Sequence, residues 1–595
     1  LTARPLVEAD ADRLYAETEG NPLFVVETLR AGWGRGPVPE GTLSPKVQAV
    51  IESRLTQLSE AARELTGVAA TIGREFTAEV LADASQFAEG TFVRALDELW
   101  RRRIVREQGA VAYDFSHDKI REVVYQRLSP ARRRYYHVRV AEALVRCRAD
   151  DPEALSGRIA FHFDRGGRAD EAVEWYQRAA GAAMRLHVNT EVVRLLDRAL
   201  DLLSALPRTA ERDARELALL TALATPLGTV EGYSSEWLSV VQQRALALAE
   251  SLATPPDGPL LRSLGIASLA RGDFAAAQRA GAQLRAQADA VDDDGIRAEA
   301  AYVLGIAAFW QGAFVAARSH FEAAVACYRP EHRAIHLLRY RLDPQVVCLS
   351  RLGNTLWFLG YPDAAVRACD AALALAEKVG HPSSRGTALV FAALLAVDLR
   401  DEARLRHSAS ALVAGRREDE MRPNHVVTPA LEGYVEVLDG HARSGIPRIQ
   451  HALAESGGTD HAPGMRAGVV RVLLEACSVA GDTGAGLAAT EQALALGGAA
   501  RVWEAEIHRK RAEFLAALGA PRDEIDAELT RALLIARRQA ARTLELRAAT
   551  SLLRHRSSRG GAAAREARTL LAAIVARFTE GWDTPDLRAA TTLLS

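Results

Sequence analysis

The chain has 595 residues, of which 49% are hydrophobic and 25% are charged, with a formal net charge of −2. This length and balance predict several folded domains or a repeat array, and exclude a single core or a disordered polymer. The near-zero charge excludes a global attraction to nucleic acid or to an anionic membrane.

The cysteines and the apolar runs bear on the cellular compartment. The five cysteines are scattered and never form CxxC: Cys147, Cys327, Cys348, Cys369 and Cys477. They predict thiols in a reducing cytoplasm, with no disulfide framework and no metal site. The longest apolar runs reach about half of the roughly 20 residues that a membrane helix needs. We find no signal peptide and expect a cytoplasmic protein; because Leu1 is not methionine, we expect a fragment of a longer protein.

Residues 41–150 have the pattern of a winged-helix domain. Ser44 and Pro45 are typical of a helix start. Apolar periodicity predicts helices at 42–58, 61–72, 77–84 and 92–102, and another helix from Asp118. A turn at Gln108-Gly109 between short apolar runs predicts one β-hairpin, with strands near Ile104 and Tyr113.

The rest of the chain repeats. Residues 151–255 are expected to hold the first helical repeats, with a turn at Gly166-Gly167 and a looser junction near 222–261. Residues 256–595 are expected to form a tetratricopeptide-like solenoid, because small or turn residues recur about every 40 positions. The turn markers are Gly272, Gly312, Gly360, Arg400-Asp401, Gly440, Gly481, Gly519 and Gly560. Their spacings are 40, 48, 40, 40, 41, 38 and 41 residues.

Positions inside the repeats support this fold class, an all-α solenoid preceded by a small winged helix. One unit carries tetratricopeptide spacings at Leu304, Gly305, Ala308, Gly312, Ala317, Phe321 and Ala324. The next carries them at Leu352, Gly353, Leu356, Gly360, Ala365, Cys369 and Ala372. Small residues let paired helices approach and large ones fill the gaps between pairs. An irregular helical bundle is the alternative.

Several segments resemble bacterial STAND-type AAA ATPases. The opening ETEGNPLFVVETLR is similar to the segment at the ATPase lid, over residues 1–40, and YDFSHDKIREVVYQRL resembles the wing and the helix after it. The C-terminal RVWEAEIHRKRAEFLAALGA looks like the closing repeats of such proteins. Many members join these parts to an adenylate/guanylate cyclase or to a transcriptional activator domain.

The resemblance implies nucleotide-contacting residues at two places. Gly20, Asn21 and Pro22 match the GxP segment, whose proline packs near the base. His117 and Asp118 match the histidine-aspartate pair that senses phosphates, although Ser116 stands where methionine is usual. A histidine at a helix N-terminus suits an anionic phosphate. The alternatives are a helix-start proline at Pro22 and a capping or packing histidine at His117.

The chain lacks the sequence of an ATPase active site. No GxxxxGK[ST] motif occurs, so neither the phosphate cradle nor the hydroxyl that binds magnesium is present. We expect no catalytic residue and no cofactor in this chain, with ATP or ADP and magnesium held by an upstream domain. We expect the parent, not this part, to be an ATPase and nucleotide cyclase.

Two other motifs have simpler interpretations. Asp292-Asp293-Asp294-Gly295 resembles a calcium loop, but Ala290 and Ala301 occupy ligand positions, so a solvated turn is favoured. The clusters 101–103 and 132–134 are basic and could touch DNA phosphates, but acidic neighbours favour a solvated surface. Four tryptophans at helical spacings are expected in the core: Trp310, Trp357, Trp503 and Trp582.

Two functions follow as hypotheses. In the first, the chain is the sensor and protein-interaction arm of a nucleotide-switched signalling ATPase that regulates an upstream cyclase. Its partners would be a protein or small molecule in the solenoid groove, the upstream nucleotide domain and a second copy of itself, without membrane or nucleic acid. In the second, the chain is the C-terminal part of an ATP-dependent transcriptional regulator whose DNA-binding domain lies elsewhere.

Overall fold

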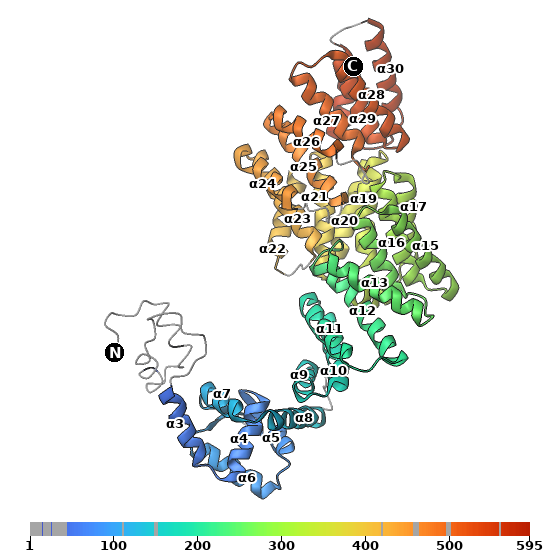
Figure 1. The fold of residues 1–595 in the computed structure, drawn as a ribbon. Coiled ribbons are helices and arrows are strands. Elements are labelled where there is room, and N and C mark those ends of the chain that lie inside the picture. Colours follow the sequence, from blue (N-terminus) through green and yellow to red (C-terminus); the bar gives the residue numbers. More distant parts are fainter. Residues whose placement is uncertain are drawn as a thin grey trace. The chain divides into compact units, whose positions relative to one another are not determined.

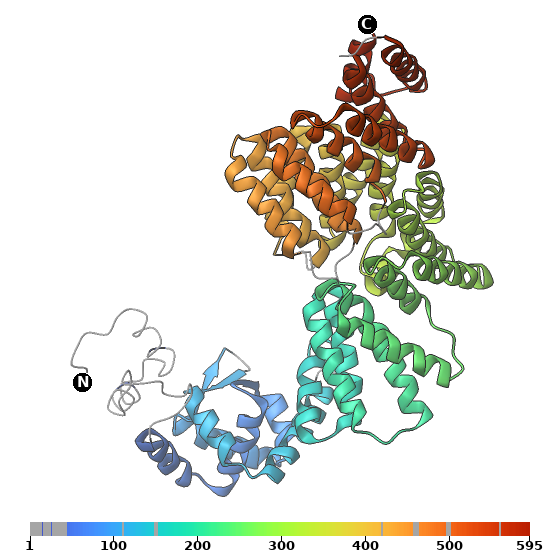
Figure 2. The ribbon, with the colours of Figure 1, turned by 45° about the horizontal axis from the view of Figure 1, so that its top comes forward.

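The computed structural model describes residues 15, 25, 45–109, 112–147, 153–417, 421–455, 463–495, 501–557 and 561–595. They form two compact units (Figures 1 and 2). The first contains the residues up to Ala182 together with Leu195–Arg208, and the second contains Ala183–Arg194 together with Thr209–Ser595. None of the described helices is both long enough and apolar enough to cross a membrane.

The first unit begins with the predicted winged-helix elements. They are α3 (Pro45–Thr56), α4 (Glu60–Ile72), β1 (Glu75–Thr77), α5 (Ala78–Ser85), α6 (Glu89–Arg101), β2 (Val105–Gln108), β3 (Ala112–Phe115) and α7 (Asp118–Arg127). The helical elements that follow are α8 (Pro130–Cys147), α9 (Ser156–Gly166), α10 (Ala169–Arg185) and α11 (Asn189–Ser204). The predicted helices and the hairpin are therefore confirmed, within a few residues at each end.

The sheet has one strand more than the sequence predicts. β3 lies in the middle of an antiparallel sheet with order β1-β3-β2, and Phe76 on β1 faces Tyr113 on β3. The expectation of a two-stranded hairpin alone was wrong, because a three-residue strand is too short to show an alternating pattern. Phe76 holds it in place: its ring is buried and lies 5.9 Å from that of Phe115.

The second unit consists of helical pairs, and Figure 2 shows the pairs from α21 to α26 stacked side by side. Its first helices are α12 (Ala210–Val230), α13 (Glu236–Ser251), α14 (Gly258–Ala270), α15 (Phe274–Val291), α16 (Asp294–Trp310), α17 (Phe314–Cys327), η1 (Pro330–His332), α18 (Arg333–Tyr340), α19 (Pro344–Phe358) and α20 (Pro362–Val379). The later helices are α21 (Pro382–Leu399), α22 (Glu402–Gly415), α23 (Arg422–Leu438), α24 (Ala442–Glu455), α25 (Pro463–Ala480), α26 (Thr483–Ala495), α27 (Glu504–Ala517), α28 (Arg522–Arg538), α29 (Arg542–Ser557), α30 (Gly561–Val575) and α31 (Pro585–Leu594).

The predicted turn residues reverse the chain where expected. A left-handed backbone is found at Gly167, Gly272, Gly312, Gly360, Arg400, Gly440, Gly481 and Gly519, whereas Gly560 lies outside the described residues. Gly312 and Gly360 also have no room for a side chain, since a Cβ there would lie 2.4 Å from Gln539 and 2.9 Å from Arg542. These positions therefore confirm the repeat period.

Packing within the pairs confirms the tetratricopeptide-like register. A Cβ on Gly305 of α16 would lie 2.6 Å from the Phe321 ring of α17, and both Ala317 and Phe321 are fully buried. Trp310, Trp357 and Trp503 are buried as predicted. The prediction for Trp582 was wrong, because half of its surface is exposed in the turn before α31. After Thr209, the described residues contain no strand.

The one long spacing, between Gly312 and Gly360, reflects an insertion. The extra segment η1 and α18 lies between α17 and α19. Arg341, at the end of α18, donates from Nε to Asn189 Oδ1 at 2.7 Å and from Nη1 to the Met184 carbonyl at 2.8 Å. The looser junction expected near residues 222–261 is a regular pair, α12 and α13, followed by a proline-rich link to α14.

Two helices of the array, α21 and α29, are buried on all sides over most of their length. Every residue from Gly386 to Asp398 of α21, and from Thr543 to Leu553 of α29, is buried. α29 contacts α19, and the Thr543 hydroxyl donates to the carbonyl of Trp357. Since a helix buried around its circumference has no open face, these described helices do not line an open groove.

Candidate functional site

The residues singled out by the sequence fall into two groups. Gly20, Asn21 and Pro22 lie outside the described residues, so their relation to the other group stays a prediction. His117 and Asp118 lie together at the start of α7, directly after the central strand β3.

His117 is the residue that links β3 to α7. Its backbone is extended, with φ −148°, and its carbonyl accepts the first turn's bond from the N–H of Ile120 at 3.0 Å. The side chain is half-buried and makes no capping hydrogen bond. A capping role for the imidazole is therefore excluded, and a packing role stays open.

The start of α7 has mixed features as a phosphate site. The first backbone N–H groups of a helix, which lack intrahelical partners, favour an anion. Asp118, at the first helical position, would repel an anion, but its carboxylate is paired with Arg121 at 2.8 Å. Lys119 is paired with Glu122 at 3.1 Å. The residues fit a phosphate contact through His117, with the neighbouring charges already balanced.

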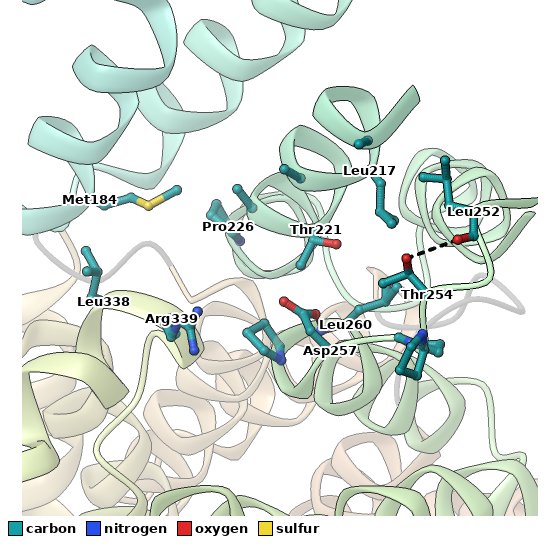
Figure 3. Close-up of a pocket in the computed structure, with 16 residues that line it drawn as sticks. Met184, Leu217, Thr221, Pro226, Leu252, Thr254, Asp257, Leu260, Leu338 and Arg339 are labelled. Atoms are coloured by element: carbon teal, nitrogen blue, oxygen red, sulfur yellow. Dashed lines mark hydrogen bonds between the residues drawn. The ribbon is translucent and has the colours of Figure 1, made fainter. Parts of the chain in front are cut away.

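A separate cavity lies at the start of the helical array. It has a volume of about 520 Å³, within the roughly 300–1,000 Å³ of typical ligand sites. Three parts of the second unit surround it: α12, the link and first turn of α14, and α18, with Met184 beside them (Figure 3). The lining residues are Met184, Ala214, Leu217, Ala218, Thr221, Ala222, Pro226, Leu252, Thr254, Pro255, Pro256, Asp257, Pro259, Leu260, Leu338 and Arg339.

Asp257 is the acid of this cavity. Its Oδ1 caps α14 by accepting from the N–H of Leu260 at 3.1 Å. Figure 3 shows its carboxylate pointing into the space below Thr221 and Pro226. Asp257 is an exposed residue beside the cavity, yet the protein around its carboxylate partly desolvates it, and this desolvation raises the pKa of Asp257.

Arg339 supplies the opposite charge. Its exposed guanidinium lowers the pKa of Asp257 in opposition to burial, yet the two side chains do not form an ion pair. Among the residues described by the structure, Arg339 has no hydrogen-bond or ion-pair partner. The cavity therefore presents one carboxylate and one guanidinium that are not neutralised by each other.

Proline shapes the polar surface of the walls. Pro226, Pro255, Pro256 and Pro259 carry no N–H, so they offer a ligand no backbone donor. Pro226 lies inside α12, where its missing N–H also leaves the carbonyl of Ala222 without its regular helical bond. The walls are therefore apolar with a surplus of acceptors, and Arg339 is the strong donor among the lining residues.

Sequence reasoning did not identify this cavity. Its signals were present: four prolines around two helix ends and a 48-residue spacing that marks the inserted α18. Neither signal predicts which helices meet. Among the described residues, no three histidine, cysteine or acidic side chains are placed to hold a metal. In the motif that resembles a calcium loop, Asp293 caps α16, and the segment is the turn that the sequence predicts.

No family model matches the chain. An uncharacterised protein of Rhizobium meliloti (strain 1021) is 24% identical over 517 residues, covering 85% of this chain and 50% of that protein. The chain thus spans about half the length of the curated relative that it matches.

Among solved structures, the chain is similar to a STAND protein with a tetratricopeptide repeat sensor from Pyrococcus horikoshii. The identity is 12% and the TM-score 0.42, covering 86% of this chain and 72% of that one. Yeast Tom70 gives 13% identity and a TM-score of 0.31, covering 75% of this chain and 95% of that one. Likenesses of this size assign no function.

Proposed function

We propose that this chain is the sensor and protein-interaction arm of a nucleotide-switched signal-transduction ATPase that regulates an upstream adenylate or guanylate cyclase domain. The observation that carries the proposal is the order of parts: a small helical unit with a three-stranded sheet, then a long tetratricopeptide-like array. Arrays of this kind present large surfaces to other molecules.

The sequence resemblance supports the nucleotide-switched part of the proposal. His117 matches the phosphate-sensing histidine of STAND proteins, and it lies at the start of α7, directly after β3. In this proposal, ADP bound by an upstream domain contacts His117 and keeps the arm closed. A ligand or partner on the array favours the open form and changes the output.

The arm itself is proposed to be non-catalytic. The sequence has no phosphate-binding loop of the GxxxxGK[ST] type, and ATP or ADP with magnesium would be held by the upstream ATPase domain. The purified chain is therefore expected to turn over neither ATP nor GTP. Turnover that persists through stringent purification, and that follows the chain in size-exclusion fractions, would contradict this part of the proposal.

A C-terminal arm of an ATP-dependent transcriptional regulator is the second candidate, because the same resemblance covers both kinds of protein. The coding sequence upstream of Leu1 distinguishes the two candidate functions. A class III cyclase domain there supports the first, and a helix-turn-helix activator domain supports the second. An upstream sequence with neither domain and no phosphate-binding loop would overturn both.

A further inference from the structure

We infer that the cavity between α12, α14 and α18 binds a small zwitterion with an apolar body, such as a large apolar α-amino acid. The inference deepens the proposed function by naming the ligand class that the sensor arm would detect, and it rests on that function only for its signalling role. Binding itself is a property of this chain.

The charges define the polar end of the ligand. Asp257 turns its carboxylate into the cavity, and one hydrogen bond, from the N–H of Leu260, is found for it. Arg339 faces the same space and has no hydrogen-bond or ion-pair partner among the described residues. An α-amino acid carries an ammonium and a carboxylate on one carbon, so it can satisfy both groups at once.

A ligand with only one charge fits less well. A cation beside Asp257 would leave the Arg339 guanidinium partnerless and repelled, and an anion beside Arg339 would do the same to Asp257. A neutral ligand would cover both charges without a partner, which costs free energy. The proline walls supply no backbone N–H that could replace Arg339 as donor for a carboxylate.

The remaining surface defines the body of the ligand. Leu217, Leu252, Leu260 and Leu338 line the cavity, and Met184 adds a flexible side chain that adapts to different shapes. Thr221, from α12, lies above Asp257 in Figure 3 and offers a hydroxyl. A volume of about 520 Å³ accommodates an aromatic or branched aliphatic side chain together with the charged head.

The position of the cavity connects binding to the array. Arg339 belongs to the inserted α18, and Arg341, two residues on, is hydrogen-bonded to Asn189 and to the Met184 carbonyl. A ligand that joins Arg339 to Asp257 would therefore fix α18 to the start of α14. Occupancy is expected to slow amide exchange in both helices.

Three probes with the same indole body separate the two charges: L-tryptophan, tryptamine and indole-3-propionate. Their binding to the full chain is measured by isothermal titration calorimetry. We expect L-tryptophan to bind most tightly. Arg339→Gln should weaken the binding of L-tryptophan and of indole-3-propionate about tenfold or more, since one charge-assisted bond is lost. The binding of tryptamine should not weaken and should become tighter, because the repulsion between its ammonium and Arg339 is removed.

Asp257→Asn should weaken the binding of L-tryptophan and of tryptamine by a similar factor. The binding of indole-3-propionate should not weaken and should become tighter, because its carboxylate is no longer repelled by that of Asp257. Asparagine also caps helices well, so this variant is expected to fold. Arg279→Gln, at an exposed arginine on α15, is the control and should change none of the affinities. Three results would overturn the inference. They are an absence of saturable L-tryptophan binding, tighter binding of tryptamine than of L-tryptophan to the wild-type chain, and an affinity for L-tryptophan that is the same in all three variants.

Failure of the ligand inference can be distinguished from failure of the proposed function. If L-tryptophan binds as described but leaves the output of the longer protein unchanged, the ligand inference stands and the sensor role fails. If it does not bind, the proposed function keeps its own test at His117.

Discussion

Lys510 on α27 donates from Nζ to Oε2 of Glu475 on α25 at 2.9 Å, and both side chains are about 95% buried. Arg471, one turn before Glu475, contacts the same carboxylate at 2.7 Å. Arg547 on α29 reaches Glu506 on α27 at 3.1 Å. Buried charges thus join one helix of each pair to the corresponding helix of the next pair along the array, from α25 through α27 to α29.

The first prediction concerns this ionic cluster. Lys510→Met should lower the free energy of unfolding by about 1.5–3 kcal/mol, because the buried Glu475 carboxylate loses one charge-assisted hydrogen bond while Arg471 remains beside it. Urea unfolding followed by circular dichroism measures it. Arg194→Met, which breaks an exposed pair with Glu191, is the control and should cost under about 1 kcal/mol.

A double-mutant cycle checks that the effect belongs to the pair. Lys510→Met combined with Glu475→Gln should be less destabilised than the sum of the two single variants, by about 0.5–3 kcal/mol. Strict additivity of the two changes would contradict a direct interaction.

The second prediction concerns Asp398. Burial raises the pKa of Asp398 to about 6, with Arg471 and Arg547 acting in the opposite direction. The folded protein therefore binds this proton more tightly than the unfolded chain, whose aspartates titrate near pH 3.9. The contribution to stability is complete below about pH 4 and is lost as the pH rises through about 6.

Asp398→Asn removes this dependence. Between pH 4 and 8 the wild-type protein should lose up to about 3 kcal/mol of unfolding free energy relative to the variant, as expected for a shift of about two pKa units. Chemical unfolding at four pH values gives the difference. Parallel stability curves for the two proteins would show that Asp398 does not titrate as described.

The third prediction concerns a histidine pair in the first unit. Nδ1 of His137 on α8 lies 2.8 Å from Nδ1 of His162 on α9, and Nε2 of His137 lies 2.8 Å from the Tyr125 hydroxyl. Burial is the main cause that lowers the pKa of His137 to about 4 and that of His162 to about 3. The contribution of this pair to the free energy of unfolding is complete above about pH 6.5, where both rings are neutral in the folded and in the unfolded chain. It is lost as the pH falls toward 4, because the unfolded chain then binds protons that the folded pair does not.

Protection of α8 and α9 against amide exchange, corrected for intrinsic rates, should therefore fall between pH 7 and 5. His162→Gln, which cannot charge, should reduce that fall. His407→Gln, at an exposed histidine on α22, should leave it unchanged. Equal pH dependence in wild type and His162→Gln would count against the pair.

The fourth prediction concerns helix approach within a repeat. Gly305→Ala would bring a Cβ to 2.6 Å from the buried Phe321 ring, so it should destabilise the protein by about 1–3 kcal/mol through overpacking. Gly484→Ala is the matched control, since a Cβ at this exposed glycine of α26 meets nothing within 4 Å. That change should be neutral or stabilise by up to about 1 kcal/mol. Thermal unfolding of both variants tests the difference, and a neutral Gly305→Ala would contradict the close packing.

The fold was largely predictable because its signals are local. Turn residues such as Gly360 and close-packing pairs such as Gly305 and Phe321 lie within one or two helices of each other, so their spacing appears directly in the sequence. The three-residue strand around Phe76 was missed because its pairing partner, Tyr113, is distant and its own pattern is too short.

The cavity was not predictable for the opposite reason. Asp257 caps α14 and Arg339 lies on α18, 82 residues later (339 − 257) or about two repeats on. Their meeting depends on how the inserted α18 packs against the start of the array. His117 was found only through its resemblance to a family motif, because one half-buried histidine at a helix start carries no chemical signature by itself.

The central claim is that His117 holds the arm against bound ADP, and the most direct test uses the longer protein that contains this chain. The measurement is ADP retained after desalting, together with basal output activity, in wild type, His117→Ala and the control His407→Ala. Loss of a hydrogen bond to a charged phosphate, worth about 1.5–3 kcal/mol, should weaken ADP retention about tenfold or more and raise basal activity in His117→Ala alone. Unchanged ADP retention together with unchanged basal activity in His117→Ala would contradict the claim.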